Sequence, residues 1–140
     1  MFDSDSLPRF IQEIVHSVPS VIYVFDIRRR KIVFLNRKGA AHDYVEESQD
    51  PEFIRSLLHP DDWQRFLDHM EELENLPDQV TSDFEYRTPD GSGGWRWFHS
   101  RDRVFTRNND GTVKEIVGTA TDVTERKGVE ERARFMTDQS

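Results

Sequence analysis

The last third of the chain most constrains its fold, because three strand-like segments there are separated by two short turn clusters. The segments cover 80–87, 95–105 and 113–124, and the clusters between them read PDGSGG and NNDG. Glycine, proline, asparagine and aspartate supply the backbone conformations that tight turns need. Strands joined by short turns run antiparallel. The sequence therefore predicts an antiparallel, three-stranded meander.

Two further strand-like segments lie near the start of the chain. VIYVFDI (21–27) is β-branched, aromatic and continuously apolar except for its aspartate, which is typical of a strand covered on both faces. IVFLN (32–36) follows the polar tetrapeptide RRRK. Two such runs around a short polar connection predict a hairpin.

Helical patterns occur before each group of strands. A stripe with spacing i, i+3, i+4, i+7, i+8 and i+11 opens the chain: Leu7, Phe10, Ile11, Ile14, Val15 and Val18. A longer helix begins after His59, because Pro60 suits a first helical position and Asp61 and Asp62 suit the positive end of the dipole. Its apolar face contains Trp63, Phe66, Leu67, Met70 and Leu73. Helices segregated from an antiparallel sheet predict one α+β domain.

Composition excludes several classes of function. The chain has no cysteine, which removes disulfides, thiolate metal sites, cysteine nucleophiles and cysteinyl-flavin adducts. A net charge of −8 disfavours binding to nucleic acid or to an anionic membrane. No apolar run approaches the roughly 18 residues of a spanning helix, and the first ten residues do not resemble a signal peptide. We expect a cytoplasmic domain, although its parent protein could be anchored elsewhere.

No pattern for catalysis or metal binding is found. The five histidines, His16, His42, His59, His69 and His99, show no metal-ligand spacing. DGSGG lies between two strands, not between a strand and a helix as a phosphate loop requires. The acidic pair Asp61 and Asp62 is explained by its position at a helix start. We therefore expect no catalytic residue and no metal site, and we interpret the chain as a non-enzyme.

Four motifs, taken in order, resemble a PAS domain with its C-terminal PAC portion. They are HPDD (59–62), FEYR (84–87), DGSGGWRWF (90–98) and GTATDVTERK (118–127), and the resemblance covers roughly Ser17 to Lys127. It implies a five-stranded antiparallel sheet in the order 2-1-5-4-3, with helices on one face that enclose a small pocket. It also implies that Asp122, Thr124 and Arg126 connect the sheet to an output helix.

The family implies a division of the chain into three parts. We expect an N-terminal amphipathic cap or dimerisation helix over 1–18, the PAS domain over 19–124, and the start of a signalling or linker helix over 125–140. PAS domains sense ligands, light or redox state, or mediate dimerisation. They usually precede a histidine kinase, a nucleotide cyclase such as a diguanylate cyclase, or another PAS module. We therefore expect a sensory and dimerisation module that relays ligand or partner state through its C-terminal helix.

Strand alternation, compared with ligand-binding PAS domains, predicts which side chains face a pocket. From the sheet these are Tyr23, Phe25, Phe34, Tyr86, Phe98, Ser100, Gly118 and Ala120, and from the long helix Phe66, Leu67 and Met70. The small residues among them would leave space, whereas the aromatic ones could fill it. A close-packed core and a site for a small apolar or aromatic ligand are both compatible with this set.

The opposite alternation places an apolar group on the outer face of the sheet: Ile22, Val24, Trp95, Trp97 and His99. Such a surface is too apolar to stay in water. Phe10, Ile11 and Ile14 of the N-terminal helix could cover it within one chain or across a homodimer, and we favour the homodimer.

No cofactor is expected, and two alternatives to a simple ligand sensor stay open. One is a redox or gas sensor that holds haem through His69 or flavin without a covalent bond. With Trp63 at zero and about 100° per residue, the apolar face centres near about 340° and His69 lies near about 240°, on its flank. The other alternative is an α+β small-molecule enzyme.

Overall fold

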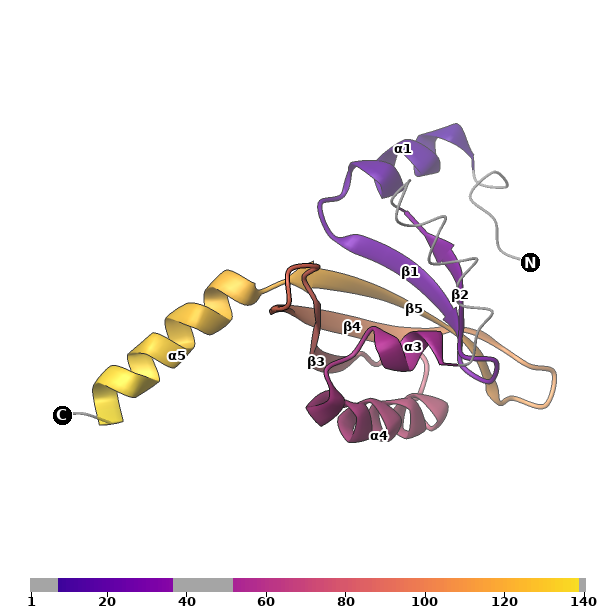
Figure 1. Ribbon diagram of the computed structural model, residues 1–140. Coiled ribbons are helices and arrows are strands. Elements are labelled where there is room, and N and C mark those ends of the chain that lie inside the picture. Colours follow the sequence, from indigo (N-terminus) through magenta and orange to yellow (C-terminus); the bar gives the residue numbers. More distant parts are fainter. Residues whose placement is uncertain (1–7, 37–51, 139–140) are drawn as a thin grey trace.

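The computed structural model describes residues 8–36 and 52–138, and in it helices pack on an antiparallel sheet (Figure 1). In chain order the elements are α1 (Arg9–Ser17), β1 (Val21–Asp26), β2 (Lys31–Leu35), α3 (Phe53–Ser56), the 3₁₀ turn η2 (Pro60–Asp62), α4 (Trp63–Glu74), β3 (Ser82–Pro89), β4 (Trp95–Arg107), β5 (Val113–Asp122) and α5 (Thr124–Asp138).

The strands lie in the order β2-β1-β5-β4-β3, and every neighbouring pair is antiparallel. This confirms the α+β fold class and the meander that the sequence patterns predicted, and the strand order that the family resemblance implied. β5 is the last strand in chain order, but it lies in the middle of the sheet, between β1 and β4. The turn between β4 and β5 contains Gly111 with a φ of +90°, a conformation that residues with a Cβ rarely adopt.

The register places Tyr23, Gly118 and Asp102 side by side on three neighbouring strands. Tyr23 of β1 pairs with Gly118 of β5, and Gly118 pairs with Asp102 of β4. Residues directly opposite each other point to the same face of a sheet. A Cβ added to Gly118 would overlap with Asp102 Oδ1 and approach the Tyr23 ring to 2.6 Å. Gly118 therefore allows these two side chains to meet.

The start of α4 matches the predicted helix start and adds a buried charge to it. His59 Nδ1 accepts a hydrogen bond of 3.0 Å from the Asp61 amide, and Pro60 opens the 3₁₀ turn that leads into the helix. Asp62 is 0% exposed. The helix-start position therefore does not explain Asp62 fully, because a buried carboxylate needs partners.

The main core lies between one face of the sheet and the helices α3 and α4. It is formed by Phe25, Ile27, Ile54, Leu58, Phe66, Met70, Leu73, Leu76, Phe84, Val113 and Ile116. Burial of apolar side chains of this kind contributes about 1.5–3 kcal/mol each relative to full exposure. The core therefore fixes α3 and α4 on one side of the sheet.

The exit helix α5 extends away from the end of β5 (Figure 1). Its exposed apolar residues are Val129, Phe135 and Met136, so most of its length has no packed face. In the part of the chain that the structure describes, no helix has the length and apolarity to cross a membrane.

Candidate functional site

A cavity of about 230 Å³ lies between the sheet and the helices α3 and α4. Eight of the eleven predicted pocket residues lie on its wall: Tyr23, Phe25, Phe66, Met70, Tyr86, Phe98, Ser100 and Ala120. The six strand residues in this group share one face, as alternation predicts, and the family resemblance had indicated which face that is. The space also shows that aromatic side chains do not fill this region completely.

Phe34 is the prediction on the sheet that the structure contradicts. It is buried and lies directly opposite Val24, on the face away from the cavity. The register between β1 and β2 shifts between Val24 and Phe25, so that Val33 of β2 is left out of the pairing with β1. An extra residue in one strand reverses the facing of the residues beyond it in that strand. Leu35 and Ile32 pair with Tyr23 and Phe25 and line the cavity in its place.

Two other predicted positions belong to the same region without forming its wall. Leu67 packs against the buried core at the side of α4. Gly118 faces the cavity side of the sheet, but the Tyr23 and Asp102 side chains occupy the space above it. Gly118 was expected to leave room for a ligand; it leaves room for a contact within the protein.

His69 was predicted on the flank of its helix, and this is wrong. It is 5% exposed and lines the cavity together with Phe66 and Met70. The buried face of α4 is formed by Phe66, His69, Met70 and Leu73, so its centre lies near about 290° rather than about 340° on the same wheel. The predicted centre of the buried face was wrong because it included Trp63 and Leu67, which are only half-buried.

A polar cluster lies on the wall of this mainly apolar cavity. The Tyr23 hydroxyl donates a hydrogen bond to Asp102 Oδ1, and His69 Nε2 lies 2.7 Å from Asp102 Oδ2. Ser82 Oγ lies 3.4 Å from the other ring nitrogen of His69. Burial, reinforced by the charge of Asp102, raises the pKa of Tyr23 well above its ordinary value. The phenol therefore keeps its proton and acts as a donor.

Asp102 is the functional candidate that the sequence reading missed. It lies on β4 two residues after Ser100 and four after Phe98, so its facing was predictable from the same alternation. It is 3% exposed. A carboxyl group at an inward position among apolar residues was the available signal, since buried carboxyl groups are rare unless paired.

An aromatic row forms the wall beside this cluster. His69 and Phe84 stack with their ring centroids 4.9 Å apart, Phe84 and Tyr86 follow at 5.4 Å, and Tyr86 and Phe98 at 6.0 Å. Stacked pairs of this geometry contribute about 0.5–1.5 kcal/mol each beyond their buried area. The row connects α4 to β3 and β4 along one side of the cavity.

The residues around His69 do not fit an axial haem ligand. One ring nitrogen faces Asp102 and the other faces Ser82, so neither points freely into the cavity. A histidine that ligates iron needs one nitrogen for the metal. This geometry disfavours the haem alternative, and no step of the function proposed below depends on a cofactor.

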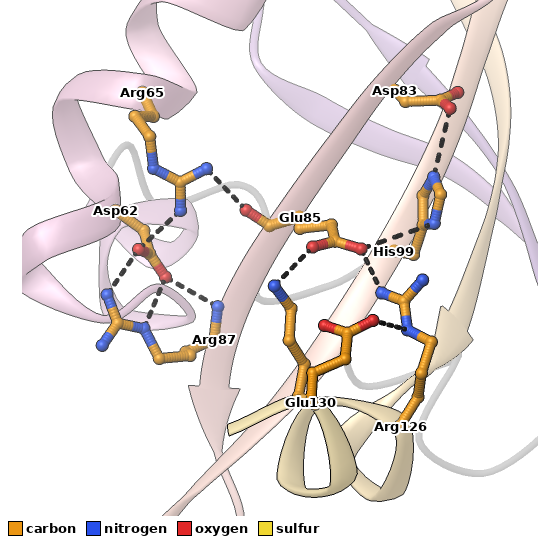
Figure 2. Close-up of polar contacts among 9 residues, drawn as sticks. Asp62, Arg65, Asp83, Glu85, Arg87, His99, Arg126 and Glu130 are labelled. Atoms are coloured by element: carbon orange, nitrogen blue, oxygen red, sulfur yellow. Dashed lines mark hydrogen bonds and ion pairs between the residues drawn. The ribbon is translucent and has the colours of Figure 1, made fainter. Parts of the chain in front are cut away.

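Around β3, the edge strand of the sheet, charged side chains connect α4, β3 and α5 (Figure 2). Arg87 donates to both oxygens of Asp62, with a shortest distance of 2.7 Å, and Arg65 donates to Asp62 at 2.7 Å. Arg65 also donates to the backbone carbonyl of Glu85 at 2.8 Å. These contacts hold the first turn of α4 against β3.

The carboxylate of Glu85 contacts α5 through two cations. Lys127 Nζ lies 2.8 Å from Glu85 Oε1, and Arg126 pairs with Glu85 Oε2 (Figure 2). Burial opposes ionisation of Glu85, but the hydrogen bonds from Lys127 and Arg126 outweigh it and lower its pKa. Arg126, a predicted relay residue, thus reaches the sheet through Glu85, which the sequence analysis did not single out.

The other two predicted relay residues lie where β5 ends. Asp122 Oδ1 accepts from the Thr124 amide at 2.9 Å, and Asp122 Oδ2 lies 2.5 Å from Arg96. The Thr124 hydroxyl accepts a hydrogen bond of 2.9 Å from the Trp97 amide. Burial opposes ionisation of Asp122, but hydrogen bonds from Thr124 and Arg96 lower its pKa. The side chains at this junction therefore attach α5 to β4.

The residues predicted to form a lid or dimer face lie in different surroundings. Phe10, Ile11 and Ile14 are 72%, 42% and 49% exposed, and Trp95 is partly exposed beside His59. By contrast, Val24 is 1% exposed and is not available to a partner. Ile22 and His99 are half-buried.

Trp97, the remaining member of that set, lies beneath two cations. Arg87 and Lys127 are 4.8 Å and 4.6 Å from its ring centroid. Cations over an indole face contribute about 0.5–1 kcal/mol at exposed sites. Because Arg87 also binds Asp62 and Lys127 belongs to α5, Trp97 is part of the connection between α4 and α5.

Comparison with known proteins identifies one family model, described as the PAS fold, which matches residues 38–120, more than half of the chain. The solved structures that are similar include an RNA-binding light-oxygen-voltage receptor, with a TM-score of 0.70 at 17% identity over 99% of this chain and 39% of that chain. No curated protein matches the chain.

Two further solved structures match this chain over nearly their whole length. One is a sensory box histidine kinase/response regulator from Burkholderia thailandensis, with a TM-score of 0.61 at 25% identity over 94% of this chain and 97% of that chain. The other is the N-terminal domain of a diguanylate cyclase with a PAS/PAC sensor from Marinobacter aquaeolei, with a TM-score of 0.59 at 14% identity over 77% and 98%.

Proposed function

Because the chain belongs to the PAS fold family, we propose that it is a non-catalytic sensory module whose cavity receives a small ligand and whose exit helix α5 transmits the bound state. The similar structures from a histidine kinase and a diguanylate cyclase support a place next to an effector of that kind, or next to a second PAS module. In this proposal residues 19–124 form the sensor domain that binds the ligand, and residues 125–140 begin the connection to the effector.

One observation carries this proposal: Glu85 contacts both the cavity helix and the exit helix. Its backbone carbonyl accepts from Arg65, one residue before the cavity residue Phe66 on α4. Its side chain binds Arg126 and Lys127 of α5. A shift of α4 caused by a molecule in the cavity therefore has a direct route to α5 through Glu85 of β3.

The mechanism that fits these contacts is a population shift. Ion pairs at a partly exposed surface contribute only about 0–1 kcal/mol each, so α5 can exchange between attached and released states. A ligand changes that balance by the difference between its affinities for the two states, and by no more. The Asp62 contacts, which are buried, keep β3 and the start of α4 together while α5 moves.

The exposed stripe on α1 supports a homodimer as part of this function. Phe10, Ile11 and Ile14 do not cover the sheet of their own chain, and apolar side chains grouped on one helix face are typical of association sites. In the proposed dimer these residues pack against a second copy. The double variant Phe10→Glu/Ile14→Glu should sediment as a monomer, whereas Arg9→Glu, which adds negative charge outside the stripe, should not. Unchanged dimer in the double variant would contradict this part.

The relay is tested by filling the cavity through mutation. Met70→Trp places a larger side chain in the cavity from α4, and Met70→Leu is the volume-matched control. We expect Met70→Trp to change amide hydrogen exchange in α5 by severalfold. The same change introduced together with Glu85→Gln should have a much smaller effect. The relay is wrong if α5 responds equally with and without Glu85, or does not respond at all.

A further inference from the structure

Polar side chains from β1, β4 and α4 meet at one point of the cavity wall. Tyr23 and His69 both point their polar atoms at the carboxyl group of Asp102. The rest of the described wall is apolar or aromatic apart from the hydroxyls of Ser100 and Thr88. A guest therefore meets a mainly apolar chamber in which Tyr23, His69 and Asp102 form the main polar group of the described wall.

The described wall carries one carboxyl group and no ammonium or guanidinium group. Asp102 is the acidic residue there, and neither lysine nor arginine is among the described lining residues. In a medium of low dielectric, a second carboxylate brought near Asp102 would be strongly disfavoured. This arrangement selects against organic acids.

The cluster offers acceptor sites rather than donor sites. The Tyr23 hydroxyl donates to one oxygen of Asp102, and His69 Nε2 approaches the other. A carboxylate has about four lone-pair positions, so Asp102 has capacity for another donor. The Tyr23 hydroxyl already donates its proton to Asp102. A guest that could only accept a hydrogen bond would therefore find no free donor in Tyr23 or Asp102.

We propose that the ligand is a small, uncharged, mainly apolar or aromatic molecule whose one polar end donates a hydrogen bond to Asp102, such as a phenol, alcohol or amide. This inference rests on the proposed function, because it concerns the same cavity. The volume of about 230 Å³ lies below the roughly 300–1,000 Å³ that accommodate drug-sized ligands. The guest is therefore about the size of a substituted benzene.

Four para-substituted toluenes separate these chemistries, because they share one ring and differ in one group. p-Cresol carries a donor, 4-methylanisole only an acceptor, p-toluate a charge and p-xylene no polar group. Titrations of the whole chain, followed by the NMR amide signals of Ser100, Asp102 and Ala120, give their affinities. We expect p-cresol to bind at least about tenfold more tightly than 4-methylanisole, as a hydrogen bond to a charged group allows, and p-toluate to bind most weakly.

Two variants test the role of Asp102. Tyr23→Phe removes the donor that occupies one oxygen, so p-cresol should bind severalfold more tightly than to the unmodified protein, an increase that loss of folding cannot produce. Asp102→Asn should reduce the preference for p-cresol over 4-methylanisole to within about threefold, since an amide both donates and accepts. Met70→Leu, on the apolar wall, should change the affinity for all four compounds alike.

The possible failures are distinguishable. If p-toluate or 4-methylanisole binds as tightly as p-cresol, or if Tyr23→Phe does not improve p-cresol binding, the proposed ligand class is wrong while the cavity remains a binding site. If none of the four compounds shifts the cavity signals, the cavity does not admit a guest of this size. In that case the sensory function proposed for it fails as well.

Discussion

The backbone amide of Trp97 donates a hydrogen bond of 2.9 Å to the hydroxyl of Thr124. The Val123 amide in turn donates to the Trp97 carbonyl at 2.8 Å. A residue of β4 thus exchanges hydrogen bonds with the residues that join β5 to α5. Thr124 serves as a connection between the sheet and the helix, while the neighbouring Asp122 accepts from the Thr124 amide.

Replacing Thr124 should loosen the exit helix. Thr124→Val keeps the shape of the side chain but leaves the Trp97 amide without its acceptor, at a cost of about 1 kcal/mol. We expect faster amide exchange at the start of α5 and a lower free energy of unfolding. Thr124→Ser retains the hydroxyl and should behave like the unmodified protein. Equal protection of α5 in the valine and serine variants would contradict this assignment.

Asp62 should make the domain sensitive to acid. Burial opposes its ionisation, but hydrogen bonds from Arg87 and Arg65 lower its pKa from 3.8 to about 2. A pKa lower in the folded than in the unfolded state stabilises the fold above about pH 4, and this contribution is lost as the pH falls through about 2. It amounts to about 2 kcal/mol at neutral pH.

Urea denaturation between pH 2 and pH 7 measures this effect. The difference in unfolding free energy between the unmodified protein and Asp62→Asn should be largest above about pH 4 and should shrink towards pH 2. Asp61→Asn is the matched control, because Asp61 is the adjacent carboxylate and is exposed. A difference that does not depend on pH would show that Asp62 acts through packing alone.

Gly118→Ala should destabilise the fold strongly. The added Cβ would overlap with Asp102 Oδ1 and lie 2.6 Å from the Tyr23 ring. Both neighbours are held in the sheet, and relief of such crowding costs about 1–3 kcal/mol or more. Thermal unfolding measures the loss. If Gly118→Ala is as stable as the unmodified protein, the Tyr23–Asp102 contact is not formed as described.

Gly128→Ala should have the opposite effect on the exit helix. A Cβ at this position of α5 meets only the end of the Arg132 side chain, at 3.6 Å. Alanine is favoured over glycine inside a helix by about 1 kcal/mol. We expect slower amide exchange along α5, and in the relay proposed above the attached state of the helix should become more populated. An unchanged exchange rate would indicate that the attachment of α5 to the sheet, rather than its helix propensity, determines its amide exchange.

The regular parts of the fold were predictable because local rules decide them. Turn residues fixed the meander, and His59 with Pro60 fixed the start of the long helix. Alternation placed Tyr23, Ser100 and Ala120 on the cavity wall, since a residue's neighbours in a regular strand determine its facing. Alternation decides only which residues share a face, and the resemblance to PAS domains supplied which face holds the cavity.

The remaining features depend on contacts between distant segments. Phe34 lies on the unexpected face because the register shifts once within β1 and β2. His69 is buried because Asp102, a residue 33 positions away, provides its partner. Glu85 connects two helices through Arg65 and Arg126, which lie on opposite sides of it in the sequence. Spacing within one element carries no information about such pairs.

The central position of β5 has a consequence for how the chain folds. β1 and β5 pair from opposite ends of the domain, as Val21 lies against Ala120, so the first hairpin cannot join the meander until the last strand has been synthesised. Pairing between distant segments is slow compared with local pairing, and an unpaired strand edge is prone to aggregation. During synthesis the β1–β2 hairpin therefore waits with its inner edge open, and truncation before β5 should leave two separate hairpins instead of a smaller domain.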